Sequence, residues 1–168
     1  DPASVVARLA LRDLLTRTAD TAAQVALMET RAAAVTGDAR AQWLSWAAQV
    51  AVTELDDHPR AAKLFRDAIM SASDPTDTLR EAYEAAIRAG DAPTANNVGA
   101  ALIERDISPR ERARLMRERF ELLLGPLDDE AGAHALLTTA LEDPDAEAWV
   151  RDAARMEGAL AGNYDLLA

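Results

Sequence analysis

Helix-start signals recur along the chain at nearly constant spacing, and this period constrains the fold more than any other feature. One series is spaced by 37, 36, 34 and 35 residues, and its members are Asp1, Asp38, Asp74, Ser108 and Asp143. A second, interleaved series is spaced by 37, 34, 37 and 35 residues, and its members are Asp20, Asp57, Asp91, Asp128 and Asn163. Short polar side chains of this kind cap the first N–H groups of helices. Two interleaved series with one period predict a repeating pair of helices, and a period of this length indicates a solenoid.

Residues 38–75 form the clearest copy of this unit, two amphipathic helices joined by a tight turn. We expect Asp38 to cap the first helix and Asp57 to cap the second, which has Pro59 in its first turn. The apolar stripe predicted for the first helix consists of Trp43, Ala47, Val50 and Leu55. The stripe predicted for the second consists of Ala61, Leu64, Phe65, Ala68 and Ile69. Neither helix can bury its stripe alone, so the pair needs neighbours.

The same reading predicts helices along the whole chain and essentially no strand. Besides the two helices within 38–75, they cover about 3–17, 21–35, 75–89, 92–105, 109–124, 129–142 and 144–161, and 163–168 resembles the start of a tenth helix. The corresponding repeats are about 1–37, 38–73, 74–107, 108–142 and a partial 143–168, within one domain. Because the chain begins with Asp1 and not Met, we expect it to be a segment of a longer protein.

Several short motifs within these repeats resemble a known family. The matching residues are Ala61, Phe65 and Pro75 for a second-helix signature, and Gly90-Asp91 and Gly162-Asn163 for a turn signature. Over nearly the whole chain the pattern resembles degenerate tetratricopeptide repeats, as in large bacterial repeat proteins, although the Leu-Gly pair of the family's first helix is absent. The resemblance implies a right-handed α-α superhelix of four helix pairs, a ninth helix and a partial tenth. Another α-solenoid, such as a HEAT-like array, is the structural alternative.

This fold would expose an extended concave surface, and in the resembled family the first helix of each pair lines it. Those helices would be the ones that start near residues 3, 38, 75, 109 and 144. The resemblance therefore implies a groove that holds a segment of another protein.

Composition excludes several classes of function. The formal net charge of −11 argues against general nucleic-acid binding, which requires a basic face. The chain contains no cysteine and therefore no disulfide or thiolate metal site. No apolar run approaches the roughly 20 residues that span a bilayer. Alanine bias and a single lysine, Lys63, suggest a GC-rich bacterial genome. The compartment is not determined by these features, with the cytoplasm slightly favoured.

The candidates for catalysis or metal binding are weak. His58 and His134 are the only histidines, and a structural or catalytic metal needs about three or four convergent ligands. Asp56 and Asp57 beside His58 suit a helix start, where acidic residues are favoured in any case. No nucleophile elbow, phosphate loop or His-Glu-x-x-His motif occurs. We therefore predict no enzyme activity, no cofactor and no metal.

A cluster of arginines suggests one kind of partner. Arg110, Arg114 and Arg117 share a helix face by their spacing, and Arg80 and Arg88 of the preceding first helix would extend it. Arginine pairs bidentately with carboxylates and phosphates, so an acidic peptide would fit such a surface. The alternative is a solvated face paired with the chain's own glutamates, Glu84, Glu111, Glu118 and Glu121.

The tryptophans offer an apolar anchor. Trp43 and Trp149 occupy similar repeat positions, where packing between repeats competes with partner contact. Trp46 is expected to be the more exposed, and exposed aromatic residues in a groove are typical partner anchors.

The predicted function is a non-catalytic scaffold that binds a peptide or helix of a partner protein in the groove. The predicted partner-binding residues are Trp46, Arg80, Arg88, Arg114 and Arg117. One alternative is a regulatory domain that senses a small ligand or signal peptide in the same groove. Another is a self-assembling array, because residues such as Val5 and Leu166 leave the first and last helices without polar caps.

Overall fold

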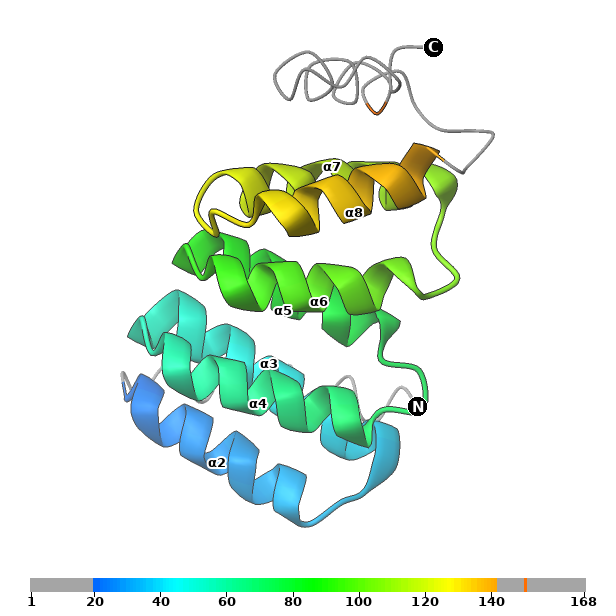
Figure 1. Cartoon of the computed structure of the whole chain (residues 1–168). Coiled ribbons are helices and arrows are strands. Elements are labelled where there is room, and N and C mark those ends of the chain that lie inside the picture. Colours follow the sequence, from blue (N-terminus) through cyan, green and yellow to red (C-terminus); the bar gives the residue numbers. More distant parts are fainter. Residues whose placement is uncertain (1–19, 142–149, 151–168) are drawn as a thin grey trace, which may run out of the picture. The chain divides into compact units, whose positions relative to one another are not determined.

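The computed structural model describes residues 20–141 and Val150, and these residues are all-α (Figure 1). The described helices are α2 (Thr21–Ala33), α3 (Gly37–Leu55), α4 (His58–Ser71), α5 (Thr76–Ala89), α6 (Ala92–Ile103), α7 (Pro109–Leu124) and α8 (Glu130–Leu141). The prediction of helices without strands is confirmed for this part of the chain, and the predicted boundaries agree to within two residues. The helices predicted at 3–17, 144–161 and 163–168, and with them the total of nine helices and a partial tenth, lie outside the described residues. None of the described helices is long and apolar enough to cross a bilayer.

The chain divides into two compact units, Asp1–Ala89 and Gly90–Ala168. The division falls at Gly90, in the turn between α5 and α6 and within the predicted third repeat. Gly90 has a φ of 67°, a left-handed conformation that glycine adopts without steric cost. The prediction of one repeat domain over 1–168 stays a prediction, and the two units are described separately below.

The predicted helix caps are confirmed at most described positions. Asp20, Asp57 and Asp91 each accept a hydrogen bond from the backbone N–H three residues on, at 3.0, 3.1 and 3.1 Å. Ser108 accepts one from the Glu111 N–H at 3.2 Å, and Asp74 accepts one from the N–H two residues on, at 3.0 Å. The helix starts of the described region are therefore largely encoded by local sequence.

Two predicted caps are wrong. Helix α3 begins at Gly37 after Thr36, which makes no side-chain cap, and the Asp38 carboxylate accepts hydrogen bonds from Ser73 instead. At the start of α8, Asp129 and not Asp128 accepts the hydrogen bond from the Gly132 N–H, at 2.9 Å. The Asp38 prediction failed because its carboxylate binds a residue 35 positions further along the chain, which local sequence does not reveal.

Helix α3 is the centre of the Asp1–Ala89 unit, because it packs against α2, α4 and α5. Its buried residues are Ala41, Leu44, Ser45, Ala47, Ala48 and Ala51. The predicted single stripe is therefore wrong for Trp43, Val50 and Leu55, which are only half-buried. A helix with neighbours on three sides buries more than one face, and small alanines allow those neighbours to approach.

Helix α4 follows its predicted stripe closely. Ala61, Leu64, Phe65 and Ala68 are buried, and Ile69 is half-buried. Helix α4 packs against α3 and α5, so one apolar stripe is enough to cover its contact surface.

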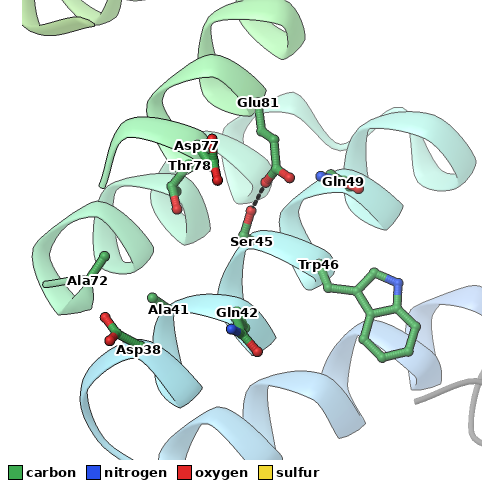
Figure 2. Close-up of a pocket in the computed structure, with 10 residues that line it drawn as sticks. All are labelled: Asp38, Ala41, Gln42, Ser45, Trp46, Gln49, Ala72, Asp77, Thr78 and Glu81. Atoms are coloured by element: carbon green, nitrogen blue, oxygen red, sulfur yellow. Dashed lines mark hydrogen bonds between the residues drawn. The ribbon is translucent and has the colours of Figure 1, made fainter. Parts of the chain in front are cut away.

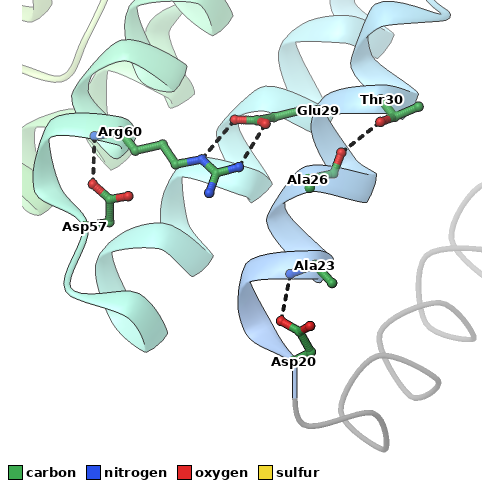
Figure 3. Close-up of polar contacts among 7 residues, drawn as sticks. All are labelled: Asp20, Ala23, Ala26, Glu29, Thr30, Asp57 and Arg60. Atoms are coloured by element: carbon green, nitrogen blue, oxygen red, sulfur yellow. Dashed lines mark hydrogen bonds and ion pairs between the residues drawn. The ribbon is translucent and has the colours of Figure 1, made fainter.

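Polar contacts within this unit join residues that are 31 to 36 positions apart in the sequence. Ser45 on α3 donates its hydroxyl to Glu81 on α5, which lies 36 residues further along the chain. Asp38 on α3 binds Ser73 of the α4–α5 connection, 35 residues further on. On α2 and α4, the guanidinium of Arg60 forms a two-pronged ion pair with Glu29, at 3.1 and 2.9 Å (Figure 3). Glu29 and Arg60 belong to the second helices of successive predicted pairs, and Ser45 and Glu81 to the first.

In the Gly90–Ala168 unit, α6 packs on α7 and α7 on α8. Arg119 on α7 donates to the side-chain oxygen of Asn96 on α6, at 3.0 Å. Leu137 and Ala140 form a small core cluster with Val150, and the apolar side chains packed against it are Met116 and Phe120. This unit thus has its own core.

The packing of α4 makes a stability prediction. We expect Phe65→Ala to lower the free energy of unfolding by about 3–5 kcal/mol, because the ring is 4% exposed and its removal leaves a cavity. Urea unfolding followed by circular dichroism measures the change. The control Lys63→Ala alters an exposed residue of the same helix and should stay within about 0.5 kcal/mol of the parent chain. Equal effects of the two substitutions would contradict the assignment of Phe65 to the core.

Candidate functional site: a pocket between α3 and α5

A pocket of about 490 Å³ lies within the Asp1–Ala89 unit, between α3 and α5 (Figure 2). The lining residues are Asp38, Ala41, Gln42, Ser45, Trp46 and Gln49 from α3, Ala72 at the end of α4, and Asp77, Thr78 and Glu81 from α5. Figure 2 shows Asp38 and Ala72 at one end and Trp46 and Gln49 towards the other. The pocket therefore follows the length of one face of α3.

Helical periodicity explains why these residues share a face. Positions 38, 42, 45 and 49 of α3 follow one another at steps of four, three and four, with 41 and 46 directly beside them, and on α5 positions 77 and 78 precede 81 by four and three residues. Helices α3 and α5 are the first helices of successive predicted repeats. The packing of α3 directly against α5 brings their lining faces together.

Trp46 supplies the aromatic surface of the pocket. It is half-buried and stacks on Trp43, with ring centroids 5.5 Å apart and an interplanar angle of 25°. Its indole extends away from the Ser45–Glu81 pair in Figure 2. Stacking between neighbouring turns of α3 restricts the ring, so the indole is held in place before any partner arrives.

Three carboxylates line the pocket, those of Asp38, Asp77 and Glu81, and among its described lining residues there is no lysine or arginine. The Asp38 carboxylate accepts from the Ser73 N–H at 2.7 Å and from its hydroxyl at 2.9 Å. The backbone hydrogen bond, and after it the hydroxyl, lower the pKa of Asp38 below its ordinary value. Asp38 is therefore a carboxylate at neutral pH.

The other two carboxylates are held differently. Glu81 accepts from the hydroxyl of Ser45, a side chain that is only 7% exposed. Asp77 forms an ion pair with Arg80, three residues further along α5, at 2.6 Å. The Asp77 side chain is 91% exposed, so solvent screens that pair strongly. The pocket thus carries concentrated negative charge that is satisfied mostly by neutral donors.

The predicted partner-binding residues lie on three helices, α3 and α5 of one unit and α7 of the other. Trp46 lines the pocket, whereas Arg80 and Arg88 lie on α5 without lining it. Arg88 donates to the backbone oxygen of Glu84 at 3.3 Å. Arg114 and Arg117 lie on α7, in the other unit, and pair one turn further on with Glu118 at 3.4 Å and Glu121 at 3.0 Å, respectively. These contacts favour the alternative of an arginine face paired with its own glutamates.

The histidine region shows capping. Asp57 caps α4, and the Nε2 atom of His58 lies 3.0 Å from Asp56. Within residues 20–141 and Val150, no group of three or more histidine, aspartate or glutamate side chains is arranged to hold a metal ion. Trp149, the third tryptophan, lies outside the described residues.

Sequence reasoning identified Trp46 but missed the acidic residues of the pocket. A signal was available, because Asp38, Gln42, Ser45 and Gln49 form a polar stripe at helical spacing beside the apolar residues of α3. What the stripe could not reveal is that Asp77 and Glu81 stand opposite it. No family model, curated protein or solved structure matches this chain.

The contact between Asp38 and Ser73 makes a pH prediction. A lowered pKa in the folded state means that the ionised carboxylate stabilises the fold. This contribution is fully present above the ordinary pKa of 3.8 and is lost as the pH falls through the lower folded value. We therefore expect the parent chain to be more stable than Asp38→Asn at about pH 5, with the difference shrinking towards about pH 2.

Chemical unfolding at a series of pH values measures this difference. The control Glu54→Gln removes a charge from an exposed position of α3 and should show a much flatter difference. A constant gap between the parent chain and Asp38→Asn at all pH values would contradict the role assigned to the carboxylate.

Proposed function

We propose that this chain is a non-catalytic scaffold that binds a peptide or helix of a partner protein along the pocket between α3 and α5. The observation that carries the proposal is that the pocket runs between two consecutive first helices and ends at an aromatic side chain. An amphipathic helix or an extended segment can lay successive side chains into such a groove.

The proposal includes the architecture. We infer a right-handed, tetratricopeptide-like solenoid in which the helix pairs continue along the chain. The packing of α3 on α5 supports it, as do the contacts Ser45–Glu81 and Asp38–Ser73, which join residues 36 and 35 positions apart in the sequence. These separations equal the period of the helix-start signals, as expected when equivalent helices of neighbouring repeats lie side by side.

The chemistry of the lining supports binding over catalysis. Its polar groups are carboxylates, hydroxyls and amides, and neither His58 nor His134 is among the lining residues. Ser45 donates to Glu81, a carboxylate, and lies in the α3–α5 contact with only 7% exposure. A hydroxyl in that position holds two helices together and has little access to a substrate.

The arginine surface stays a separate prediction. Arg114 and Arg117 pair with glutamates of their own helix, so they offer less free charge than their number suggests. If they nevertheless bind an acidic partner, Arg114→Glu combined with Arg117→Glu will abolish the binding. The pocket proposal expects no effect of this double substitution.

Removal of the aromatic anchor tests the proposal. We expect Trp46→Ala to weaken peptide binding by about tenfold or more, because buried tryptophans at interfaces often contribute about 2 kcal/mol. The probe is a displayed library of random peptides selected on the parent chain, and the affinities of the selected peptides are then measured by fluorescence anisotropy.

Met70→Ala is the matched control. Met70 is the most exposed large apolar residue described, at 81%, and it does not line the pocket. Peptides that lose affinity equally for both variants bind through general apolar contact. Peptides that are indifferent to Trp46→Ala, or a library that yields no binder, would contradict groove binding.

A further inference from the structure

We propose that the pocket between α3 and α5 recognises a partner segment that carries arginine or lysine. This inference rests on the proposed function and adds the chemistry of the partner. It differs from the acidic partner predicted from the arginine-rich sequence of α7.

The charge of the lining is one-sided. Carboxylates line the pocket on both walls, Asp38 from α3 and Asp77 and Glu81 from α5, and none of the lining residues in the described part of the chain is a cation. Arg80 pairs with Asp77 at the exposed end of that side chain. The described lining is therefore negative, although solvent screens the exposed carboxylates of Asp38 and Asp77 more than that of the half-buried Glu81.

Glu81 is the strongest element of this site. It is half-buried, and it accepts a hydrogen bond from the hydroxyl of Ser45. A neutral donor orients the carboxylate and leaves its charge in place. An ion pair would orient the carboxylate but would also cancel its charge. An oriented and uncancelled carboxylate is complementary to a guanidinium, which can approach with two parallel N–H groups.

Trp46 favours arginine further. The half-buried indole, restrained by stacking on Trp43, presents aromatic surface within the same pocket. Guanidinium groups bind the faces of tryptophan rings by cation–π attraction and by planar stacking. A segment with a basic residue beside an apolar residue would therefore use both the acidic wall and the aromatic end.

The experiment uses synthetic peptides of one shared sequence with a single apolar anchor. A few chosen positions differ between the peptides, and at these positions each peptide carries arginine, lysine, glutamate or glutamine. Their affinity for the full chain is measured by fluorescence anisotropy at low and physiological salt. We expect the arginine peptides to bind best, the lysine peptides next, and the glutamate peptides least.

Two double variants separate the pocket from the general acidity of the chain. The combination of Asp77→Asn and Glu81→Gln should lower the affinity for the arginine peptides by about tenfold or more, because charge-assisted hydrogen bonds are lost. Glu54→Gln with Glu104→Gln removes the same formal charge from exposed positions outside the pocket and should leave affinity within about twofold, because exposed charges contribute little. Equal weakening by both pairs would overturn the inference in favour of non-specific attraction. Thermal unfolding checks that both double variants are folded.

The remaining outcomes separate this inference from the proposed function. If glutamate or glutamine peptides bind best, and Trp46→Ala weakens them, groove binding stands and the basic partner is wrong. If no peptide depends on Trp46, groove binding itself fails. If the chain self-associates with increasing concentration and the Asp77 and Glu81 variant abolishes it, a second copy occupies the pocket and the inference is overturned.

Discussion

The packing of α3 against three neighbours is the constraint on which the described part of the Asp1–Ala89 unit depends. Ala47, Ala48 and Ala51 are fully buried, and their lack of bulk allows α2, α4 and α5 to approach one helix closely. Close approach leaves little space for adjustment, since protein interiors are packed as densely as organic crystals. The remaining face of α3, with Gln42 and Trp46, is consequently held in a defined orientation beside α5. The pocket results from this packing.

Hydrogen bonds between residues far apart in the sequence then select how the helices pair. Apolar contacts between alanine-rich surfaces are non-directional, so they do not by themselves specify which residues pair. Ser45 can bind Glu81, and Asp38 can bind Ser73, only when segments 36 and 35 residues apart are paired. Glu29 with Arg60 does the same for α2 and α4. Breaking such a contact leaves polar groups poorly satisfied, which disfavours shifted pairings even where each bond adds only about 1 kcal/mol.

These two levels of organisation explain which features could be predicted from sequence. Helix boundaries depend on caps and glycines close in sequence, so positions such as Asp57 and Ser108 were predicted correctly. The burial pattern of α3 was predicted incorrectly. A single apolar stripe is expected only for a helix with one partner surface, and α3 has three neighbours. For the pocket, Trp46 was found by its residue type alone. Glu81 was missed because the hydroxyl that orients its carboxylate belongs to Ser45, which is 36 residues away in the sequence.

The same difference between local and distant contacts explains why the sequence predicted an acidic partner, whereas the pocket favours a basic one. The arginines of α7 are conspicuous because they are neighbours in sequence, but neighbours on a helix also reach their own glutamates, as Arg117 reaches Glu121. Such exposed pairs within one helix are screened and contribute only about 0.3–0.5 kcal/mol. The acids of the pocket are dispersed in sequence and converge only through packing. Asp38 and Glu81 are held there by serines, which orient a carboxylate and leave its charge intact. The proposed basic partner rests on this difference, because the described contacts of Asp38 and Glu81 are with neutral serines, whereas Arg114 and Arg117 pair with glutamates.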